Sequence, residues 1–146
     1  MTSRAYRALQ VFLWFICAFH VVVGLSLNVP LVQLQTIADY YGARVDWTPQ
    51  FLYILKPVGA FMLVLGGLAG AAALAPLRHR AIVYGFVGLF GVRALQRLVF
   101  QQEIHSAFSI APARNLGAMV LFFAMAVALL VLYRHVEGRQ DPATKG

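Results

Sequence analysis

Four apolar runs, each long enough to cross a lipid bilayer, constrain this chain more than any other feature of its sequence. A helix needs about 20 mostly apolar residues to cross the hydrocarbon core. We place the spans at about 8–29, 49–75, 81–100 and 116–133. A transmembrane barrel would instead show alternating segments of about ten residues. The sequence therefore predicts an all-α, integral membrane four-helix bundle that forms a single transmembrane domain, 1–146.

The charge balance excludes several other classes of protein. Charged residues make up 12% of the chain, about half of what soluble domains carry. The net charge of +7 would suit a nucleic-acid-binding protein, but the cations lie between the apolar runs and not along one groove. We therefore expect neither a nucleic-acid partner nor an ordinary soluble enzyme. The single cysteine, Cys17, cannot form a disulfide within the chain.

Residues that begin or end helices separate the spans. Thr48 can cap the second helix, with Pro49 at its first position. The outer loop, 30–48, is either a plain polar loop or contains a short surface helix near 31–38. The polar tail, 137–146, follows the last span. The first span is longer than the apolar core of a signal peptide, so we expect it to be retained.

The distribution of cations predicts the topology. Cytoplasmic loops of membrane proteins carry an excess of Lys and Arg. Only Arg44 and Arg114 lie in the loops on one side, whereas seven cations lie on the other: Arg4, Arg7, Arg78, Arg80, Arg134, Arg139 and Lys145. This bias predicts that both termini are cytoplasmic. We expect a multi-pass protein of the cell inner (cytoplasmic) membrane.

Small residues are concentrated in the second and third spans. Transmembrane helices associate through small residues that let their backbones approach closely. The candidate packing residues are Gly59, Gly66, Gly70, Gly85, Gly88 and Gly91. Because a short turn joins 49–75 to 81–100, we expect these two spans to be close neighbours. The same glycines could serve a homodimer, or could be present only because glycine is common in such helices.

Polar residues inside the spans are the candidates for a binding site, because charge in hydrocarbon is costly. They come from three spans and lie at a similar depth: His20, Asn28, Lys56, Arg93, Gln96 and Arg97. Together they predict a cationic pocket in the outer leaflet, for a lipid phosphate, a quinone head group or an acidic segment of a partner. The alternatives are structural pairing within the protein and side chains that extend to the membrane interface.

His20 has two interpretations of its own. A histidine in a span most often makes a hydrogen bond between helices, but it could also be the axial ligand of a haem or a chlorophyll. No other chemistry is visible. The chain has no HExxH, GxSxG or phosphate-binding loop, no histidine and cysteine spacing typical of a metal site, and no carboxylate deep in a span. We therefore expect no catalytic residue and no bound metal.

The second and third spans resemble a known family. The glycine-rich second span and the arginine at position 93 resemble the DoxX-like small four-helix bacterial membrane proteins over residues 40–134; the matching residues are Lys56-Pro57-Val58-Gly59-Ala60, Gly66-Gly67 and Arg93. The resemblance implies a respiratory membrane with quinone-linked oxidoreductases. It carries over no catalytic residue.

These observations favour a non-catalytic accessory or structural subunit of a larger membrane complex, of an electron-transfer or photosynthetic type. Its partners would be membrane lipids and other membrane-protein subunits. The alternative is a DoxX-like protein that binds a quinone or a lipid head group in the cationic pocket. A small dimeric transporter is the third hypothesis.

Overall fold

The computed structural model describes residues 4–140, which contain six helices and no strand. Four helices are long, namely α1 (Arg4–Ser26), α3 (Pro49–Leu74), α4 (Arg80–Val99) and α6 (Pro112–Gln140). Two are short, namely α2 (Leu31–Tyr41) and α5 (Gln101–Phe108). The long helices are the ones with the length and composition to cross a membrane, which confirms the number of predicted spans.

The helix boundaries differ from the predicted ones mainly in the last span. Instead of 116–133, α6 begins at Pro112 and continues to Gln140. The predicted polar tail therefore starts inside a helix, and the rest of it, with Lys145, lies outside the described residues. The outer loop contains the short helix α2, the first of its two predicted forms. The helix α5 was not predicted.

Two residues mark helix ends through their chemistry, Thr48 at the start of α3 and Gly42 at the end of α2. The hydroxyl of Thr48 accepts a hydrogen bond of 3.2 Å from the backbone N–H of Phe51, which satisfies a donor that the first turn of α3 leaves unpaired. Gly42 ends α2 in the left-handed conformation, with a φ of 70°, where a side chain would be strained.

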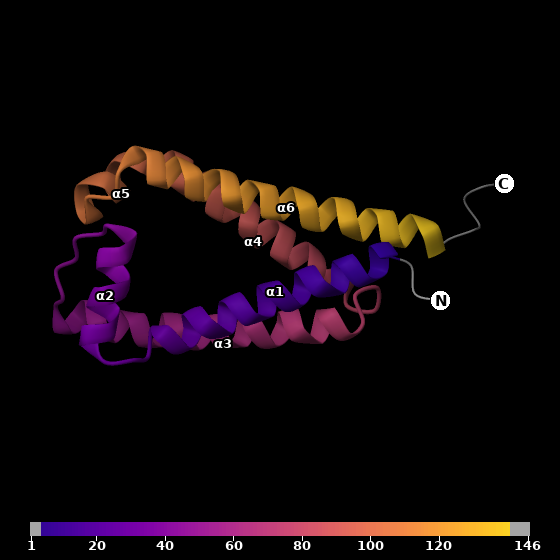
Figure 1. The fold of residues 1–146 in the computed structure, drawn as a ribbon, viewed down its shortest axis with the longest axis horizontal. Helices are drawn as coiled ribbons and strands as arrows, with labels where there is room; N and C mark the ends of the chain where they lie inside the picture. The colour runs from indigo at the N-terminus through magenta and orange to yellow at the C-terminus, as the bar shows by residue number, and fades with distance from the viewer. Residues whose placement is uncertain (1–3, 141–146) are drawn as a thin grey trace.

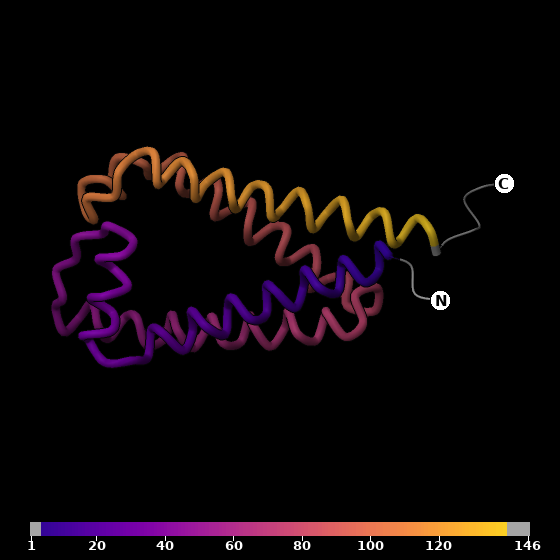
Figure 2. The backbone as a smooth tube through the Cα atoms, viewed as in Figure 1, coloured from indigo at the N-terminus to yellow at the C-terminus, as the bar shows by residue number. Residues whose placement is uncertain are grey.

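The long helices form two pairs (Figures 1 and 2). One pair is α1 with α3 and the other is α4 with α6, while α1 also contacts α6. The pairs lie close together where α3 turns into α4 and diverge toward α2 and α5 (Figure 1). Contacts between α3 and α4 are few. The predicted close packing of these two spans is therefore limited: the short connection makes them consecutive and they do touch, but the glycines of α3 pack on α1.

The contact between α1 and α3, here called the α1–α3 seam, is built on glycine. A Cβ added to Gly59 would lie 2.8 Å from the carbonyl oxygen of Gly24, so both backbones approach as closely as they can. A Cβ on Gly66 would lie 2.7 Å from Val21, and one on Gly70 would lie 3.4 Å from the Cys17 sulfur. Gly59 and Gly66 thus lie in close contact with α1, and Gly70 lies in ordinary van der Waals contact with it.

The glycines of α4 behave differently. A Cβ added to Gly85, Gly88 or Gly91 would meet no atom within 4 Å. Their predicted role in close packing was wrong for contacts within the described chain. The α4–α6 seam, the contact between those two helices, instead uses large side chains, with Phe90 stacked on Phe122 at 6.2 Å between ring centroids.

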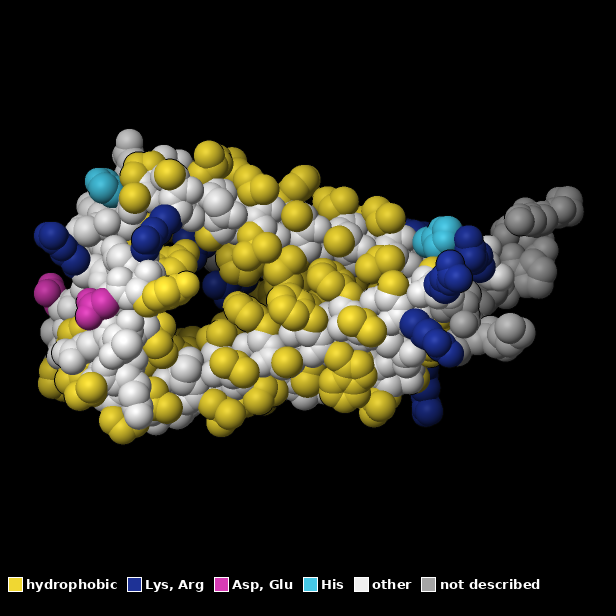
Figure 3. Space-filling view, in the orientation of Figure 1, with side chains coloured by type: hydrophobic (Ala, Val, Ile, Leu, Met, Phe, Trp, Pro, Cys, Tyr) yellow, Lys and Arg dark blue, Asp and Glu magenta, His cyan; other side chains and the backbone are white. Residues whose placement is uncertain are grey.

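Apolar side chains cover the outer faces of the long helices (Figure 3). Side chains such as Val11, Phe61 and Leu121 are each more than half exposed. A soluble domain rarely leaves so large a continuous apolar surface in water. This surface supports a multi-pass membrane protein whose outer faces contact lipid.

Candidate functional site

A cationic cavity lies where α4 meets α5. It has a volume of about 280 Å³ and is lined by Arg93, Gln96, Arg97, Phe100 and Ile104. Arg93, Gln96 and Arg97 share one face of α4, Phe100 follows the end of that helix, and Ile104 comes from α5. Figure 3 shows that the molecule is hollowed between the two helix pairs toward this end, with a Lys or Arg side chain visible inside. Three of the predicted pocket residues thus line one cavity.

Arg97 has a partner on the neighbouring helix. Its Nη1 donates a hydrogen bond of 2.9 Å to the side-chain oxygen of Asn115, and the Asn115 amide donates one of 2.8 Å to the Arg97 carbonyl. Asn115 is only 3% exposed, so this reciprocal pair links α4 to α6 inside the protein. Sequence reasoning did not single out Asn115, although a polar amide next to a predicted span is a signal for such a contact.

Arg93 has no such partner. Its guanidinium lies over the ring of Phe122, with the central carbon 4.7 Å from the ring centroid. Within residues 4–140 this half-buried group makes no hydrogen bond, and the single ion pair joins Arg134 and Glu137. Its electrostatic neighbours are Arg97 and Tyr41. A stack on one aromatic face leaves the N–H donors of Arg93 free to bind an acceptor.

Lys56 and Asn28 belong to the α1–α3 seam. The Lys56 ammonium donates a hydrogen bond of 3.2 Å to the carbonyl oxygen of Leu27, just beyond the end of α1. The Asn28 amide donates one of 2.9 Å to the carbonyl oxygen of Gly24. Neither residue lines the cationic cavity. The structure therefore places three of the predicted pocket residues at the cavity and two at the seam, apart from His20.

His20 lies between the two pairs and is 2% exposed. Its Nδ1 donates a hydrogen bond of 2.8 Å to the Ile16 carbonyl. The rings of Phe19 and Phe86 lie 5.5 Å from the imidazole and that of Phe90 lies 6.2 Å away. The imidazole is thus packed among three phenyl rings, and its role as an axial ligand of haem or chlorophyll stays a prediction. Residues 4–140 also contain no group of three metal-ligating side chains.

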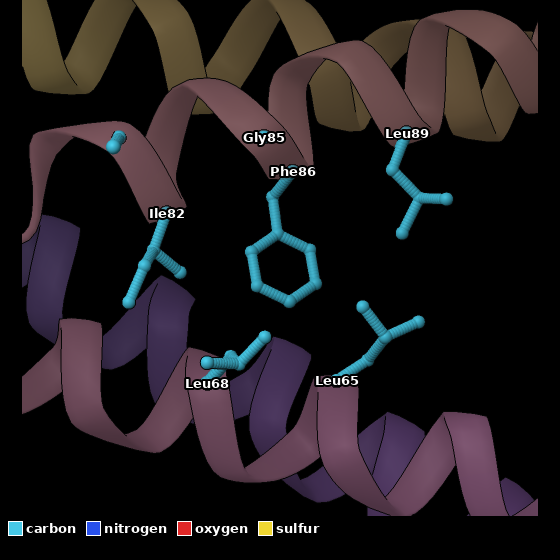
Figure 4. A pocket seen from close by; sticks show the side chains of 7 residues that line it. Leu65, Leu68, Ile82, Gly85, Phe86 and Leu89 are labelled. Carbon is cyan, nitrogen blue, oxygen red and sulfur yellow. The ribbon is translucent and has the colours of Figure 1, made fainter.

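A second, apolar cavity lies between α3 and α4 (Figure 4). It has a volume of about 440 Å³ and is lined by Leu65, Leu68, Ala81, Ile82, Gly85, Phe86 and Leu89. Figure 4 shows the side chains of α3 and α4 pointing toward one another across it. Leu89 and Arg93 are one helical turn apart, so the apolar and cationic cavities follow each other along one face of α4.

Comparison with known proteins adds nothing to this geometry. No family model, no curated protein and no solved structure matches the chain. The resemblance to DoxX-like proteins therefore stays a prediction. Function has to be inferred from the residues of the two cavities.

Proposed function

We propose that this chain is a multi-pass membrane protein that binds an anionic membrane phospholipid in its cationic cavity. One observation carries the proposal: the Arg93 guanidinium lies half-buried in a candidate span, and no residue in 4–140 accepts a hydrogen bond from it or forms an ion pair with it. An ionised group in hydrocarbon is costly unless it is paired. A lipid phosphate supplies both the missing charge and the missing acceptors.

The electrostatics favour an anion over a neutral head group. Arg93 and Arg97 both lie over the Phe122 ring, with their central guanidinium carbons at 4.7 and 5.9 Å from its centroid. Two like charges this close repel each other, and a phosphate between them removes the repulsion and binds guanidinium groups with strong hydrogen bonds. The carbonyl of a quinone, the other predicted occupant, accepts hydrogen bonds but brings no charge.

The shape of the site favours an amphiphile. The apolar cavity begins one turn from Arg93 and contains only apolar side chains and one glycine. A lipid with its phosphate at Arg93 would lay its acyl chain along Phe86 and Leu89 toward Leu65. A free inorganic phosphate or an acidic peptide would leave this second cavity without an occupant.

The membrane orientation is part of the same proposal. The described chain begins and ends beside the turn between α3 and α4 (Figure 1), and Arg4, Arg78 and Arg134 lie at that end. The excess of cations supports a cytoplasmic location for both termini, a four-helix bundle in the inner membrane, and a cationic cavity in the outer leaflet. A DoxX-like identity is compatible with this arrangement. An accessory subunit and a dimeric transporter stay predictions from the sequence.

Lipid retention tests the proposal. The wild type, Arg93→Leu and the matched control Arg44→Leu would be purified in a mild detergent and weighed by native mass spectrometry with phosphatidylglycerol added. Arg44 is exposed and lies in a loop, so its substitution removes the same charge outside the cavity. We expect the wild type and the control to bind one lipid. We expect the affinity of Arg93→Leu for that lipid to be lower by about tenfold or more.

Two results would contradict the proposal. One is equal lipid binding by Arg93→Leu and Arg44→Leu, which would mean that the cavity makes no use of its free cation. The other is a wild type that retains a quinone and no phospholipid.

A further inference from the structure

One ring nitrogen of His20, Nε2, has no hydrogen-bond partner and is a second feature that points to a ligand. The Nδ1 of His20 lies 2.8 Å from the Ile16 carbonyl, which can only accept a hydrogen bond, so Nδ1 carries the proton of the neutral ring. Nε2 is then a hydrogen-bond acceptor. No residue in the described part of the chain donates a hydrogen bond to Nε2, although His20 is only 2% exposed.

Nε2 of His20 keeps a small accessible surface. Within residues 4–140, every fully buried side-chain nitrogen or oxygen has a hydrogen-bond partner. Since Nε2 has none, it belongs to the small part of His20 that is not enclosed. An acceptor that is almost buried, has no donor and keeps some accessible surface is a position where a ligand hydroxyl can bind.

His20 and Arg93 are linked by two neighbouring aromatic rings, those of Phe90 and Phe122. The ring of Phe90 lies 6.2 Å from that of His20 on one side and 6.2 Å from that of Phe122 on the other. Arg93 lies over Phe122 and is an electrostatic neighbour of His20. The groups around His20 come from α1 and α4, and Arg93 is the charged one among them. A free acceptor from one helix pair and a free donor from the other therefore lie next to the same two stacked rings, Phe90 and Phe122, and interact electrostatically.

We infer that the head group bound by Arg93 also carries a hydroxyl group, which donates a hydrogen bond to Nε2 of His20. This inference rests on the proposed function and narrows the ligand to an anionic phospholipid with a free alcohol in its head, of the phosphatidylglycerol kind. The phosphate pairs with Arg93, and the alcohol meets the acceptor that the protein leaves open. A head group with an ammonium ion would instead place a third positive charge beside Arg93 and Arg97.

The test compares two lipids of equal charge. Phosphatidylglycerol and phosphatidylmethanol both carry one phosphate charge, but a methyl group in the second replaces the glycerol and its hydroxyls. We expect the wild type to bind phosphatidylglycerol roughly three- to tenfold more tightly, which is the effect of one hydrogen bond. Affinities would be measured by native mass spectrometry of the full chain titrated with each lipid.

His20→Phe is the diagnostic variant. Phenylalanine keeps the ring that packs on Phe86 and Phe90, and the Ile16 carbonyl keeps its helical hydrogen bond to the backbone N–H at position 20. We expect this variant to bind the two lipids equally, with unchanged affinity for phosphatidylmethanol. The control is His135→Phe, which changes an exposed histidine at the opposite end and should keep the wild-type preference.

The outcomes separate this inference from the proposed function. If the wild type binds both lipids equally while Arg93→Leu weakens both, the role of His20 is wrong and lipid binding stands. If Arg93→Leu affects neither lipid, the proposed function itself is wrong. Should His20→Phe fail to fold, NMR of labelled imidazole nitrogens in the wild type decides: phosphatidylglycerol must shift the Nε2 resonance of His20, and an unchanged resonance overturns the inference.

Discussion

The two helix pairs pack in opposite ways. In the α1–α3 seam, Gly24 and Gly59 bring two backbones together, and a single Cβ would lie 2.8 Å from a carbonyl oxygen. In the α4–α6 seam, Phe90 and Phe122 separate the backbones, and Arg97 bonds to Asn115 across the gap. Close glycine packing leaves no room for a ligand. Packing by large rings and long polar side chains leaves cavities beside them.

The difference in packing between the two seams indicates where a small membrane protein can bind a ligand. The close seam gives the structure its stability through many short contacts. The α4–α6 seam contributes fewer such contacts, but α4 presents a cation to the space between the pairs and forms an apolar cavity there with α3, while His20 of α1 adds an acceptor. The comparison predicts that substitutions at the first seam change stability, whereas substitutions at the cavity change binding.

The largest effect is expected for Gly59→Leu. A Cβ at this position would lie 2.8 Å from the backbone carbonyl oxygen of Gly24 and would also meet the Asn28 side chain, so the helices must separate, and we expect a loss of about 3 kcal/mol or more. The control is Gly67→Leu, about two turns further on, where a Cβ would meet nothing within 4 Å. The free energy of unfolding of Gly67→Leu should stay within about 0.5 kcal/mol of that of the wild type.

Cys17 provides the measurement for these variants. It is the one cysteine of the sequence and is half-buried beside Gly70. A thiol-reactive dye that fluoresces on reaction with Cys17 therefore reports thermal opening of the α1–α3 seam in detergent. Equal unfolding temperatures for Gly59→Leu and Gly67→Leu would show that glycine contact does not stabilise this pair.

An intermediate effect is expected for Asn115→Ala. The change removes both hydrogen bonds to Arg97 and leaves its guanidinium without a partner, so we expect a loss of about 1–2 kcal/mol. Gln33→Ala, at an exposed amide of α2, is the matched control and should have no effect. The same thermal assay measures both variants. An Asn115→Ala protein that unfolds at the wild-type temperature would refute the role of this pair.

The smallest effect on stability is expected for Arg93→Leu in lipid-free protein. The variant loses a contact with Phe122 worth about 0.5–2 kcal/mol, but it also loses a half-buried unpaired charge. We expect the two contributions to cancel to within about 1 kcal/mol. Arg97→Leu, which loses the guanidinium hydrogen bond to the Asn115 side chain, should be clearly less stable.

Adding phosphatidylglycerol should separate the unfolding temperatures of the wild type and Arg93→Leu. A ligand that binds the native state raises its stability, so the lipid should raise the unfolding temperature of the wild type and not that of Arg93→Leu. If Arg93→Leu destabilises the lipid-free protein as much as Arg97→Leu does, Arg93 is a structural residue and the contrast between the seams fails.

The sequence predicts what depends on neighbouring residues in the chain. Four apolar runs of sufficient length predict four long helices, because hydrocarbon leaves the backbone no other partner. Thr48 predicts the start of α3 for a similar reason, since its hydroxyl reaches a donor only three residues away. Arg93, Gln96 and Arg97 could be placed on one face from helical periodicity alone.

Contacts between distant segments could not be predicted in this way. Glycine spacing shows that α3 has a small-residue face, but not that α1 rather than α4 packs on it. Asn115 is an ordinary polar residue until the fold places it 2.9 Å from Arg97. The separation of Lys56 from Arg93 likewise follows from the pairing of helices, because Lys56 reaches Leu27 at the end of α1.

The order of the two seams along the chain has a consequence for biogenesis. Both helices of the α1–α3 seam are complete once Leu74 has been synthesised, so this hairpin can form before α4 has left the ribosome. Arg97 enters the membrane 18 residues ahead of Asn115. At about 5–20 residues per second, this delay lasts roughly one to four seconds. During that interval the nascent α4 depends on the insertion machinery to shelter its arginines.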